Sequence, residues 1–207
     1  MFPVITISRE YGSGGHGIAK IVADHLDIPF YDGAIIDQVA VESGFDKAYI
    51  KEKDESTSSL ENFLMANIFS NSFFESPQDQ IYKYQRQFVI EKAKEGPCVI
   101  VGRLADIILA EEGIPALNIF IHANREYRIK RIVDVYKDPA DEADMIVDKK
   151  DKGRKAYYKY YTDTTFGDYE NYALSLDSEI LGEETCVKYI IDAAIAFGQK
   201  YLGEPKK

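Results

Sequence analysis

The sequence predicts an α/β protein in which a parallel sheet is covered by helices on both faces. Short, almost continuously apolar runs alternate with longer segments of helical periodicity, and such runs are typical of strands buried on both faces. A glycine-rich turn joins the first apolar run directly to a helical segment. The chain has 207 residues, of which 45% are hydrophobic. We therefore expect one domain with a full core, over residues 1–207.

Five strands are expected in chain order. A β-branched run that begins at Val4 forms the first, and the other four are expected at 28–31, 98–101, 117–121 and 173–176. A Gly, Asp, Arg or His stands at or just past the end of each strand. Ligands of parallel α/β sheets bind beyond the carboxyl ends of the strands. The residues at these ends are therefore candidates for one shared site.

Helical periodicity lies between and after these strands. The segments with this pattern are 15–26, 33–43, 60–72, 78–95, 103–112, 124–137, 141–162 and 183–200. Segment 44–80 is polar and weakly patterned, with a charged run followed by a Ser/Thr cluster. Two interpretations fit this segment: a mobile helical insertion over the site, or a plain solvated loop.

The turn after the first strand has the features of a phosphate-binding loop. Four of the six residues 12–17 are glycine, which permits positive φ and close approach of a ligand. Backbone N–H groups and the positive end of the next helix dipole then favour an anion. In the register of the Walker pattern G-x-x-x-x-G-K-[ST], Arg9 stands at the first glycine, Gly15 at the lysine and His16 at the Ser/Thr. The alternative is a tight strand–helix turn that binds nothing, although a turn alone needs fewer glycines.

Arginines at two other places are suited to binding phosphate. Arg103 follows the third strand, and its planar fork can hold a phosphate; alternatively it forms a surface salt bridge, for example to Asp106. Arg125, Arg128 and Arg131 recur at every third residue, so they lie along one side of a helix. Three like charges are stable there when an anion is near, or when acidic neighbours pair with them.

Segment 149–161 is strongly basic and rich in tyrosine. Lys150, Arg154, Tyr157 and Tyr161 can share one helix face. A lid that closes over a polyphosphate fits this pattern, and so does an exposed helix with i,i+4 ion pairs. Nucleic-acid binding by charge and stacking is a third interpretation, which the acidity of the whole chain opposes.

The formal net charge of −10 argues against a nucleic-acid or membrane-surface partner, because both need a basic surface. Cys98 and Cys186 stand in apolar contexts and are expected to be core residues in a reducing compartment. The first strand starts too near the N-terminus to leave room for a signal peptide, and no apolar run has membrane-spanning length. We therefore expect a cytoplasmic protein. His16, His25 and His122 lack ligand spacing, so no metal site is expected.

The order and spacing of these motifs resemble a known family. The motifs are Ile5–Gly15, Pro29–Asp32, Cys98–Arg103 with Asp106, the pair Arg128 and Arg131, Asp151–Arg154 with the tyrosines of 157–161, Asn171–Leu174 and Leu176–Ser178. Together they resemble the cytidylate kinase-like family, relatives of the bacterial CMP kinases among the P-loop nucleoside monophosphate kinases. The resemblance extends from residue 4 to about residue 195.

The resemblance implies a three-layer P-loop fold with a five-stranded parallel sheet. It also implies a helical acceptor insertion at about 33–80 and a helical lid at about 132–170. The implied activity is phosphoryl transfer from ATP, with Mg²⁺ carried by the donor phosphates, to a nucleoside monophosphate, CMP being the favoured acceptor. The implied partners are therefore small-molecule nucleotides.

The roles implied by the resemblance fall into three groups. The donor phosphates would be cradled by the glycine loop, which comprises Gly12, Ser13, Gly14, Gly15, His16 and Gly17. The acceptor would be held near the ends of the second and third strands, by Tyr31, Asp32 and Arg103. The transferring phosphoryl group would be neutralised by Arg128, Arg131 and Arg154. Asp151 would orient Arg154 or another lid arginine.

The glycine loop departs from the family's pattern, because Gly15 and His16 replace the lysine and the magnesium-binding hydroxyl. Loss of a cation at the donor phosphates should cost several kcal/mol of transition-state stabilisation. Arg9, at the opening of the loop, is the first candidate to replace it, unless it pairs with Glu10 or another acid. Lys20 is a second candidate, but its place one turn into the helix predicts that it points away.

Two functions of different classes follow. An active nucleotide kinase is favoured by the retained arginines at 103, 128, 131 and 154, because a pure binder has no use for a transition-state clamp. A nucleotide- or anion-binding regulatory protein without kinase activity is favoured by the absent lysine. A kinase with a different small acceptor is a third interpretation.

Overall fold

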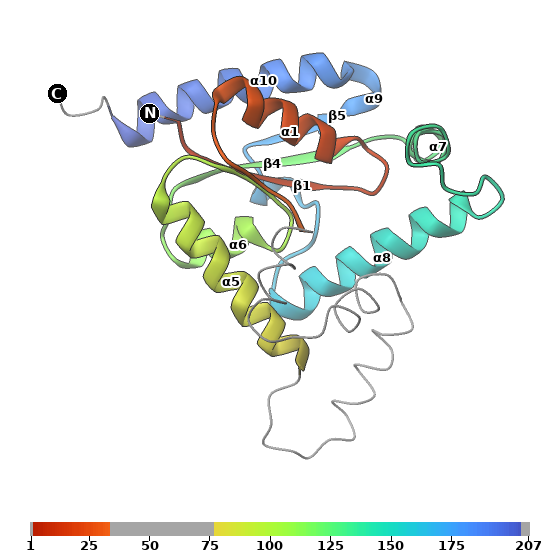
Figure 1. The fold of residues 1–207 in the computed structure, drawn as a ribbon, viewed down its shortest axis with the longest axis horizontal. Coiled ribbons are helices and arrows are strands. Elements are labelled where there is room, and N and C mark those ends of the chain that lie inside the picture. The colour runs from red at the N-terminus through yellow and green to blue at the C-terminus, as the bar shows by residue number, and fades with distance from the viewer. Residues whose placement is uncertain (1, 34–76, 204–207) are drawn as a thin grey trace.

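The structure is a computed structural model that describes residues 2–33 and 77–203 (Figure 1). The helices expected at 33–43 and 60–72 lie outside the described residues, apart from residue 33. The expected acceptor insertion at about 33–80 also lies outside them, except where its last residues begin helix α5 (Pro77–Glu95). The described part of the chain contains the sheet, the glycine loop and the basic segments.

The sheet has five strands in the order β2-β3-β1-β4-β5, and every pairing is parallel. The strands are β1 (Val4–Arg9), β2 (Phe30–Tyr31), β3 (Val99–Val101), β4 (Ala116–His122) and β5 (Leu174–Asp177). This confirms the predicted sheet. Strand β1, which leads into the glycine loop, is the central strand, so the loop opens at the middle of the carboxyl edge.

Helices cover both faces of the sheet and complete the three predicted layers (Figure 1). One face carries α1 (Gly15–Leu26) and α10 (Glu183–Phe197). The opposite side carries α5, α6 (Ala105–Glu111) and α8 (Ala143–Tyr161). The short helices α7 (Arg125–Arg131) and α9 (Ser178–Leu181) follow β4 and β5 directly.

Two predicted helices are divided in the structure. The helix expected at 124–137 is α7 followed by a π-helical turn at Ile132–Tyr136. The helix expected at 183–200 is α10 followed by a π-helical turn at Gly198–Leu202. A single turn of 3-10 helix, Tyr169–Asn171, precedes β5. Local periodicity does not distinguish a π-helical turn from α-helix, because the two differ by one residue per hydrogen-bonded ring.

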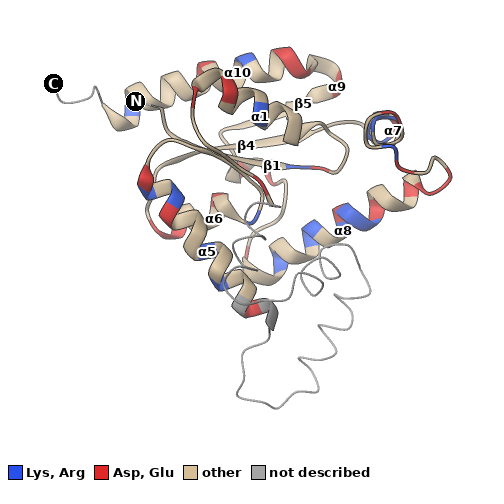
Figure 2. Ribbon diagram, in the orientation of Figure 1, with Lys and Arg blue, Asp and Glu red and all other residues tan. Residues whose placement is uncertain are grey.

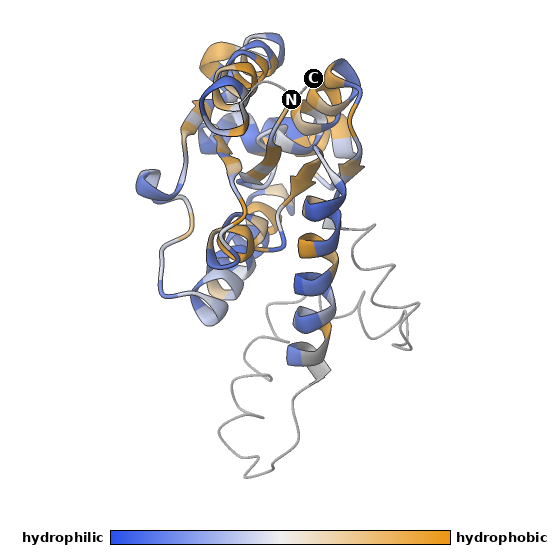
Figure 3. Ribbon diagram, turned by 90° about the vertical axis from the view of Figure 1, so that its left-hand side faces the viewer, coloured by the Kyte–Doolittle hydropathy of each residue, from blue (hydrophilic) through white to orange (hydrophobic). Residues whose placement is uncertain are grey.

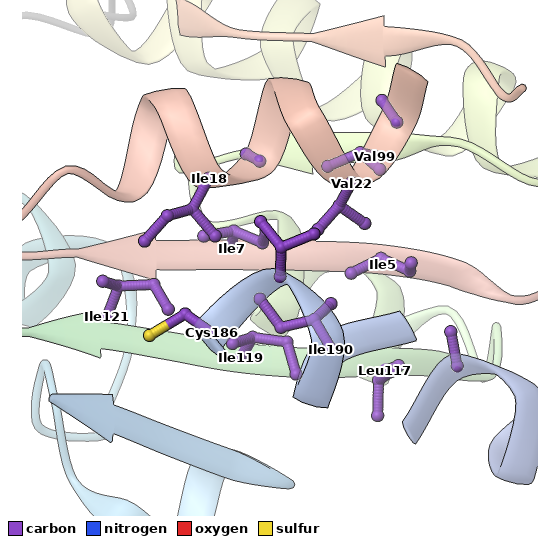
Figure 4. Packing of buried hydrophobic residues seen from close by; sticks show 14 of the residues in the cluster. Ile5, Ile7, Ile18, Val22, Val99, Leu117, Ile119, Ile121, Cys186 and Ile190 are labelled. Carbon is purple, nitrogen blue, oxygen red and sulfur yellow. The ribbon is translucent and has the colours of Figure 1, made fainter. Parts of the chain in front are cut away.

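The main core lies between the sheet and helices α1 and α10. Ile18 and Val22 of α1 are one helical turn apart and fully buried against Ile5 and Ile7 of β1 (Figure 4). The strands are the most hydrophobic elements, and the helices turn hydrophilic surfaces outward (Figure 3). Fully burying one such side chain stabilises the fold by about 1.5–3 kcal/mol. This apolar layer therefore fixes the start of α1 against the end of β1.

Polar groups are buried on the other side of the sheet. The Thr6 hydroxyl donates to Asn118 Oδ1 (2.7 Å). Asp106 of α6 is 2% exposed and accepts a hydrogen bond from the Tyr158 hydroxyl of α8 (3.2 Å). Burial raises the pKa of the Asp106 carboxyl above its ordinary value, against the opposing effect of hydrogen bonds from Ile107 and Tyr158. This polar contact ties α8 to the body of the domain.

Both cysteines are buried and free, as expected for core residues. Cys186 belongs to the apolar layer under α10, and Cys98 lies on the α5 side of the sheet. Within the part of the chain that the structure describes, every helix is too short or too polar to cross a bilayer.

Candidate functional site

The glycine loop joins the end of β1 to the start of α1, and its backbone requires glycine at two positions. Gly12 and Gly14 both adopt left-handed conformations with φ of 81°. A Cβ atom at Gly12 would lie 2.8 Å from the carbonyl oxygen of Arg128. A Cβ atom at Gly14 would lie 3.1 Å from Nε of Arg131. These glycines therefore let helix α7 approach the loop closely.

Two serines hold the loop in shape. Ser13 is fully buried, and its hydroxyl lies 2.9 Å from the carbonyl oxygen of Glu10, to which it donates. The Ser178 hydroxyl, at the start of α9, donates to the carbonyl oxygen of Ser13 (2.6 Å). The expected cradle uses the backbone N–H groups of residues 12–17, and the Ser13 side chain holds that backbone in shape. Ser178 belongs to the motif Leu176–Ser178, to which the sequence assigns no function. In the structure, its hydroxyl supports the backbone of the glycine loop.

The start of α1 has the local features of an anion site. Gly14 is the N-cap and has no side chain, and the first turn contains no acidic residue. The first N–H groups of an α-helix have no partner within the helix. The helix dipole adds a partial positive charge at the same place. The combination of left-handed glycines and an uncapped helix start matches a phosphate-binding loop.

Arg9 lies directly beside this loop. A Cβ atom at Gly15 would stand only 2.7 Å from Cβ of Arg9. The carbonyl oxygen of Arg9 accepts a hydrogen bond from Nη1 of Arg154 (2.9 Å), and the Arg154 guanidinium lies 5.4 Å from the centre of the Tyr11 ring. The structure thus brings two of the predicted arginines together, one from β1 and one from α8.

Arg128 is buried at the base of the loop in a dense polar network. Its guanidinium contacts Oδ2 of Asp151 at 2.5 Å and also donates to the carbonyl oxygen of Tyr11 (3.1 Å). The other oxygen of Asp151 accepts from the Tyr11 N–H (2.8 Å). Glu10 contacts Arg128 at 3.4 Å. Arg128 and Asp151 therefore join α7, α8 and the loop, and Asp151 fixes the position of the Arg128 guanidinium.

Arg131 reaches over the opposite side of the loop. It forms an ion pair with Glu183 at the start of α10, and both side chains lie against Gly14. Arg125, on the first turn of α7, instead pairs with Asp144 and with Asp148 of α8 (2.9 and 2.5 Å). All three α7 arginines are thus paired with acidic side chains, which is one of the two arrangements expected from the sequence. Among these three, only Arg131 contacts Gly14.

The acceptor side of the predicted site is formed at the ends of β2 and β3. Arg103 and Leu104 adopt left-handed backbone conformations (φ 55° and 58°), which cost on the order of 1 kcal/mol each. The Arg103 guanidinium lies against Gly33, where a Cβ atom would be 3.1 Å from Nη2. The suggested surface salt bridge from Arg103 to Asp106 is wrong, because Asp106 is buried. Backbone strain at Arg103 is compatible with a functional position.

His16 connects the two sides. Its Nε2 lies 2.8 Å from Oδ2 of Asp32, and its ring packs edge-on against Phe30. Tyr31 packs edge-on against Phe88 of α5, with 5.4 Å between ring centres. The residue at the Ser/Thr position of the Walker register therefore contacts Asp32, one of the residues expected to hold the acceptor.

The second half of α8 is anchored to α5 by its tyrosines. The Tyr157 hydroxyl donates to Gln85 (2.9 Å), and the Tyr161 hydroxyl donates to Asp79 (3.2 Å). Tyr161 also stacks on Tyr82, with ring centres 4.0 Å apart. Figure 2 shows Lys and Arg residues along α7 and α8, with acidic residues among them. The tyrosines of this basic segment thus pack against the domain.

The fold and the loop define the class of protein. A parallel sheet in the order 2-3-1-4-5, with a glycine loop after its central strand, is a P-loop kinase-type α/β fold. Similar solved structures include an uncharacterized protein from Eubacterium ventriosum, with 26% identity, a TM-score of 0.71, and coverage of 94% of this chain and 99% of that chain. Two kinases share the fold. One is a shikimate kinase from Bacteroides thetaiotaomicron, with 16% identity, a TM-score of 0.52, and coverage of 93% of this chain and 98% of that chain. The other is a gluconokinase from Sinorhizobium meliloti, with 12% identity, a TM-score of 0.51, and coverage of 97% of this chain and 98% of that chain.

The sequence also matches the cytidylate kinase-like family over residues 4–180. This chain therefore belongs to the cytidylate kinase-like family. No curated protein matches the sequence.

Sequence reasoning gave no site role to two acids around the loop. Glu183 and Glu10 contact Arg131 and Arg128 respectively. Glu10 directly follows the first strand, so the strand-end rule could have flagged it. Gly102, which the strand-end rule did flag, lies against the Arg9 guanidinium. Nothing near Glu183 in the sequence indicates that it would meet Arg131, because that contact depends on how α10 docks.

Proposed function

We propose that this protein transfers a phosphoryl group from ATP to a nucleoside monophosphate, with a CMP-like acceptor favoured. One observation carries the proposal: Arg9 of β1 and Arg131 of α7 lie against the glycine loop, and Arg154 of α8 contacts Arg9 and Tyr11 just before it. Phosphoryl transfer needs little covalent chemistry from the protein, so catalysis depends on positioning and on charge stabilisation. Converging cations around a loop open to anions supply both.

The residues present fit the polyphosphate of ATP. The N–H groups of the glycine loop and the start of α1 would hold the donor phosphates, while Arg131 and Arg154 would neutralise the transferring group. Arg128 and Asp151 would hold the loop and α8 in register. Bound Mg²⁺ would supply charge neutralisation between the donor phosphates.

The protein offers magnesium little direct ligation in the described residues. No group of three or more carboxylate, histidine or cysteine side chains gathers there, and His16, at the position of the usual hydroxyl, contacts Asp32. We therefore propose that the ion arrives on the donor phosphates. Buried thiols and nucleotide substrates are consistent with a cytoplasmic location.

A regulatory nucleotide-binding protein without kinase activity is the second candidate. The observation that favours it is the pairing of Arg128 with Asp151 and of Arg131 with Glu183. These acids already offset charges that a kinase would direct at the transferring phosphoryl group. Such a protein would bind ATP or ADP and respond to their ratio.

A coupled ADP-release assay with ATP–Mg²⁺ separates the two candidates. The purified protein is tested against CMP, dCMP, UMP, AMP and GMP, with calorimetric binding of ATP measured in parallel. Turnover with one or more monophosphates supports the kinase, whereas ATP binding without turnover supports the regulator. Arg131→Ala should lower turnover strongly, and Arg125→Ala, on the same helix but away from Gly14, is the matched control.

Arg103→Ala tests the acceptor side of the proposal. We expect it to abolish turnover and weaken monophosphate binding while leaving ATP affinity unchanged. The reason is that Arg103 lies at the end of β3 against Gly33, rather than against the glycine loop. Unchanged monophosphate affinity in calorimetric titrations would give Arg103 a structural role instead.

A further inference from the structure

We propose that Arg9 is the cation of the donor phosphates, and that positions 9 and 15 have exchanged the glycine and the cation of the Walker pattern. In the register G-x-x-x-x-G-K, a glycine stands at position 9 and a lysine at position 15. Here the same two positions hold Arg9 and Gly15. The inference deepens the proposed function, on which it rests, by naming the residue that replaces the missing lysine.

Strand geometry directs Arg9 at Gly15. Alternate residues of a strand point to the same face, and Ile5 and Ile7 of β1 point into the layer covered by α1. Arg9 continues this series, so its side chain leaves the strand on the side where α1 begins. The alternation along β1 therefore predicts the side of the strand that Arg9 takes, and the packing of α1 on β1 brings Gly15 to it.

The space between these positions admits one side chain. A Cβ atom at Gly15 would lie 2.7 Å from Cβ and 3.1 Å from Cγ of Arg9. Cβ of Arg9 is fixed by the strand backbone and cannot move aside as a flexible chain end could. A lysine at position 15 is thus incompatible with Arg9 in its present place, whereas a glycine at position 9 would remove both contacts.

The Arg9 side chain extends from the loop toward the end of β3. A Cβ atom at Gly102 would collide with Nη1 of Arg9 and would lie 3.4 Å from its Cζ. Gly102 immediately precedes Arg103, on the acceptor side. The Arg9 guanidinium therefore lies between the glycine loop and the residue proposed to bind the acceptor, where a phosphoryl group would pass.

Lys20 is not a suitable substitute. Its Nζ contacts Asp24 on the exposed surface of α1 (3.2 Å). This places its charge on the outer side of the helix, as its position in the sequence predicted. Lys20→Ala consequently serves as a control for loss of a positive charge near the loop.

The charge is tested with Arg9→Met, which keeps an unbranched side chain beside Gly15 and removes the guanidinium. We expect affinity for ATP and for inorganic tripolyphosphate to fall about 10- to 100-fold, the range for one charged hydrogen bond. The affinity for tripolyphosphate should also depend less steeply on salt. Lys20→Ala should leave both affinities unchanged. Parental affinities in a folded Arg9→Met protein would overturn the proposal.

The exchange is tested by reversing it. Gly15→Lys alone should lower the melting temperature, because two side chains compete for one space. The double variant Arg9→Gly/Gly15→Lys should recover the melting temperature and most of the tripolyphosphate affinity, since the remaining contact, 3.3 Å to Cβ of Ile121, needs only a small shift. A double variant no better than either single variant would refute the exchange.

These outcomes are separable from the fate of the proposed function. If the parent protein binds tripolyphosphate through Arg9 but phosphorylates no monophosphate, the role of Arg9 is supported and the proposed kinase function is contradicted. If the parent protein phosphorylates a monophosphate and the Arg9→Met variant has the same turnover and the same KM for ATP, the kinase function is supported and the role of Arg9 is refuted.

Discussion

The two faces of the sheet are built on the same strands but by different chemistry. Under α1 and α10, the buried layer is aliphatic, with Ile5, Ile7 and Ile119 fully buried. Toward α5, α6 and α8, buried polar groups such as Asp106 alternate with apolar ones. Apolar burial stabilises without direction, whereas hydrogen-bonded groups fix particular partners. The comparison indicates that both faces stabilise the fold, but only the specific contacts of the polar side position α8, with Arg154, at the loop.

The largest effect is expected from breaking the polar side. Arg128→Met leaves the Asp151 carboxylate buried without its guanidinium, and loss of one partner of a buried pair costs about 3–5 kcal/mol. Urea unfolding followed by circular dichroism measures this. The double variant Arg128→Met/Asp151→Leu should recover most of the loss, and Arg125→Met, which breaks exposed pairs, should cost about 1 kcal/mol or less. Equal losses in the two single arginine variants would contradict this account.

The apolar side is broken by Ile119→Ala. Ile119 is fully buried in the middle of β4, and truncation of a buried isoleucine costs about 2–5 kcal/mol through lost transfer energy and a cavity. The same unfolding experiment measures the change. Ile180→Ala, at a site that is 80% exposed, should change stability by less than about 0.5 kcal/mol. A loss below 1 kcal/mol in Ile119→Ala would show that the layer can collapse around the gap.

The pH dependence of stability distinguishes the two sides more finely. Burial raises the pKa of Asp106 in the folded protein above its ordinary value of 3.8. Between the unfolded and the folded pKa, the folded state therefore binds more protons than the unfolded state. The protonated Asp106 carboxyl thus favours the folded state at low pH, and this stability is lost as the pH rises through the folded pKa. Asp106→Asn should gain stability relative to the parent as the pH rises, because the neutral amide carries no charge to be desolvated on burial.

The advantage of Asp106→Asn should shrink as the pH is lowered and the parent carboxyl becomes protonated. Melting temperatures at several pH values measure it, with Asp144→Asn, on an exposed ion pair, as the control. Parallel curves for the parent and Asp106→Asn across this range would mean that the carboxyl does not titrate in the folded protein.

The smallest effect concerns the two thiols, one on each side of the sheet. Burial raises the pKa of Cys98 to about 12 and also raises that of Cys186. Neither thiol should react with an aromatic disulfide reagent at pH 8 in the folded protein, because the thiolate is the reactive form. Both should react in urea. Fast labelling of one thiol in the native protein would reveal local opening of its side.

The sequence by itself determined the local features of this protein. The β-branched run at Val4, the glycines of residues 12–17 and the apolar spacing of Ile18 and Val22 dictate a strand, a loop and a helix in that order. Alternation of strands and helices was enough to predict the parallel sheet, and it placed Arg103 just past the end of the third strand. These predictions succeed because backbone geometry sets the periods of strands and helices, whatever surrounds them.

Only the tertiary structure decided which charges meet. Spacing placed Arg125, Arg128 and Arg131 on one side of a helix, but their partners lie on α8, on the loop and on α10. Likewise, the Walker register placed Arg9 at the opening of the loop, but its contact with Gly15 depends on how α1 packs on β1. The physical reason is that an ion pair requires atoms within a few ångströms. Helix docking, which is set by the whole core, controls distances on that scale, whereas the period of a single helix does not.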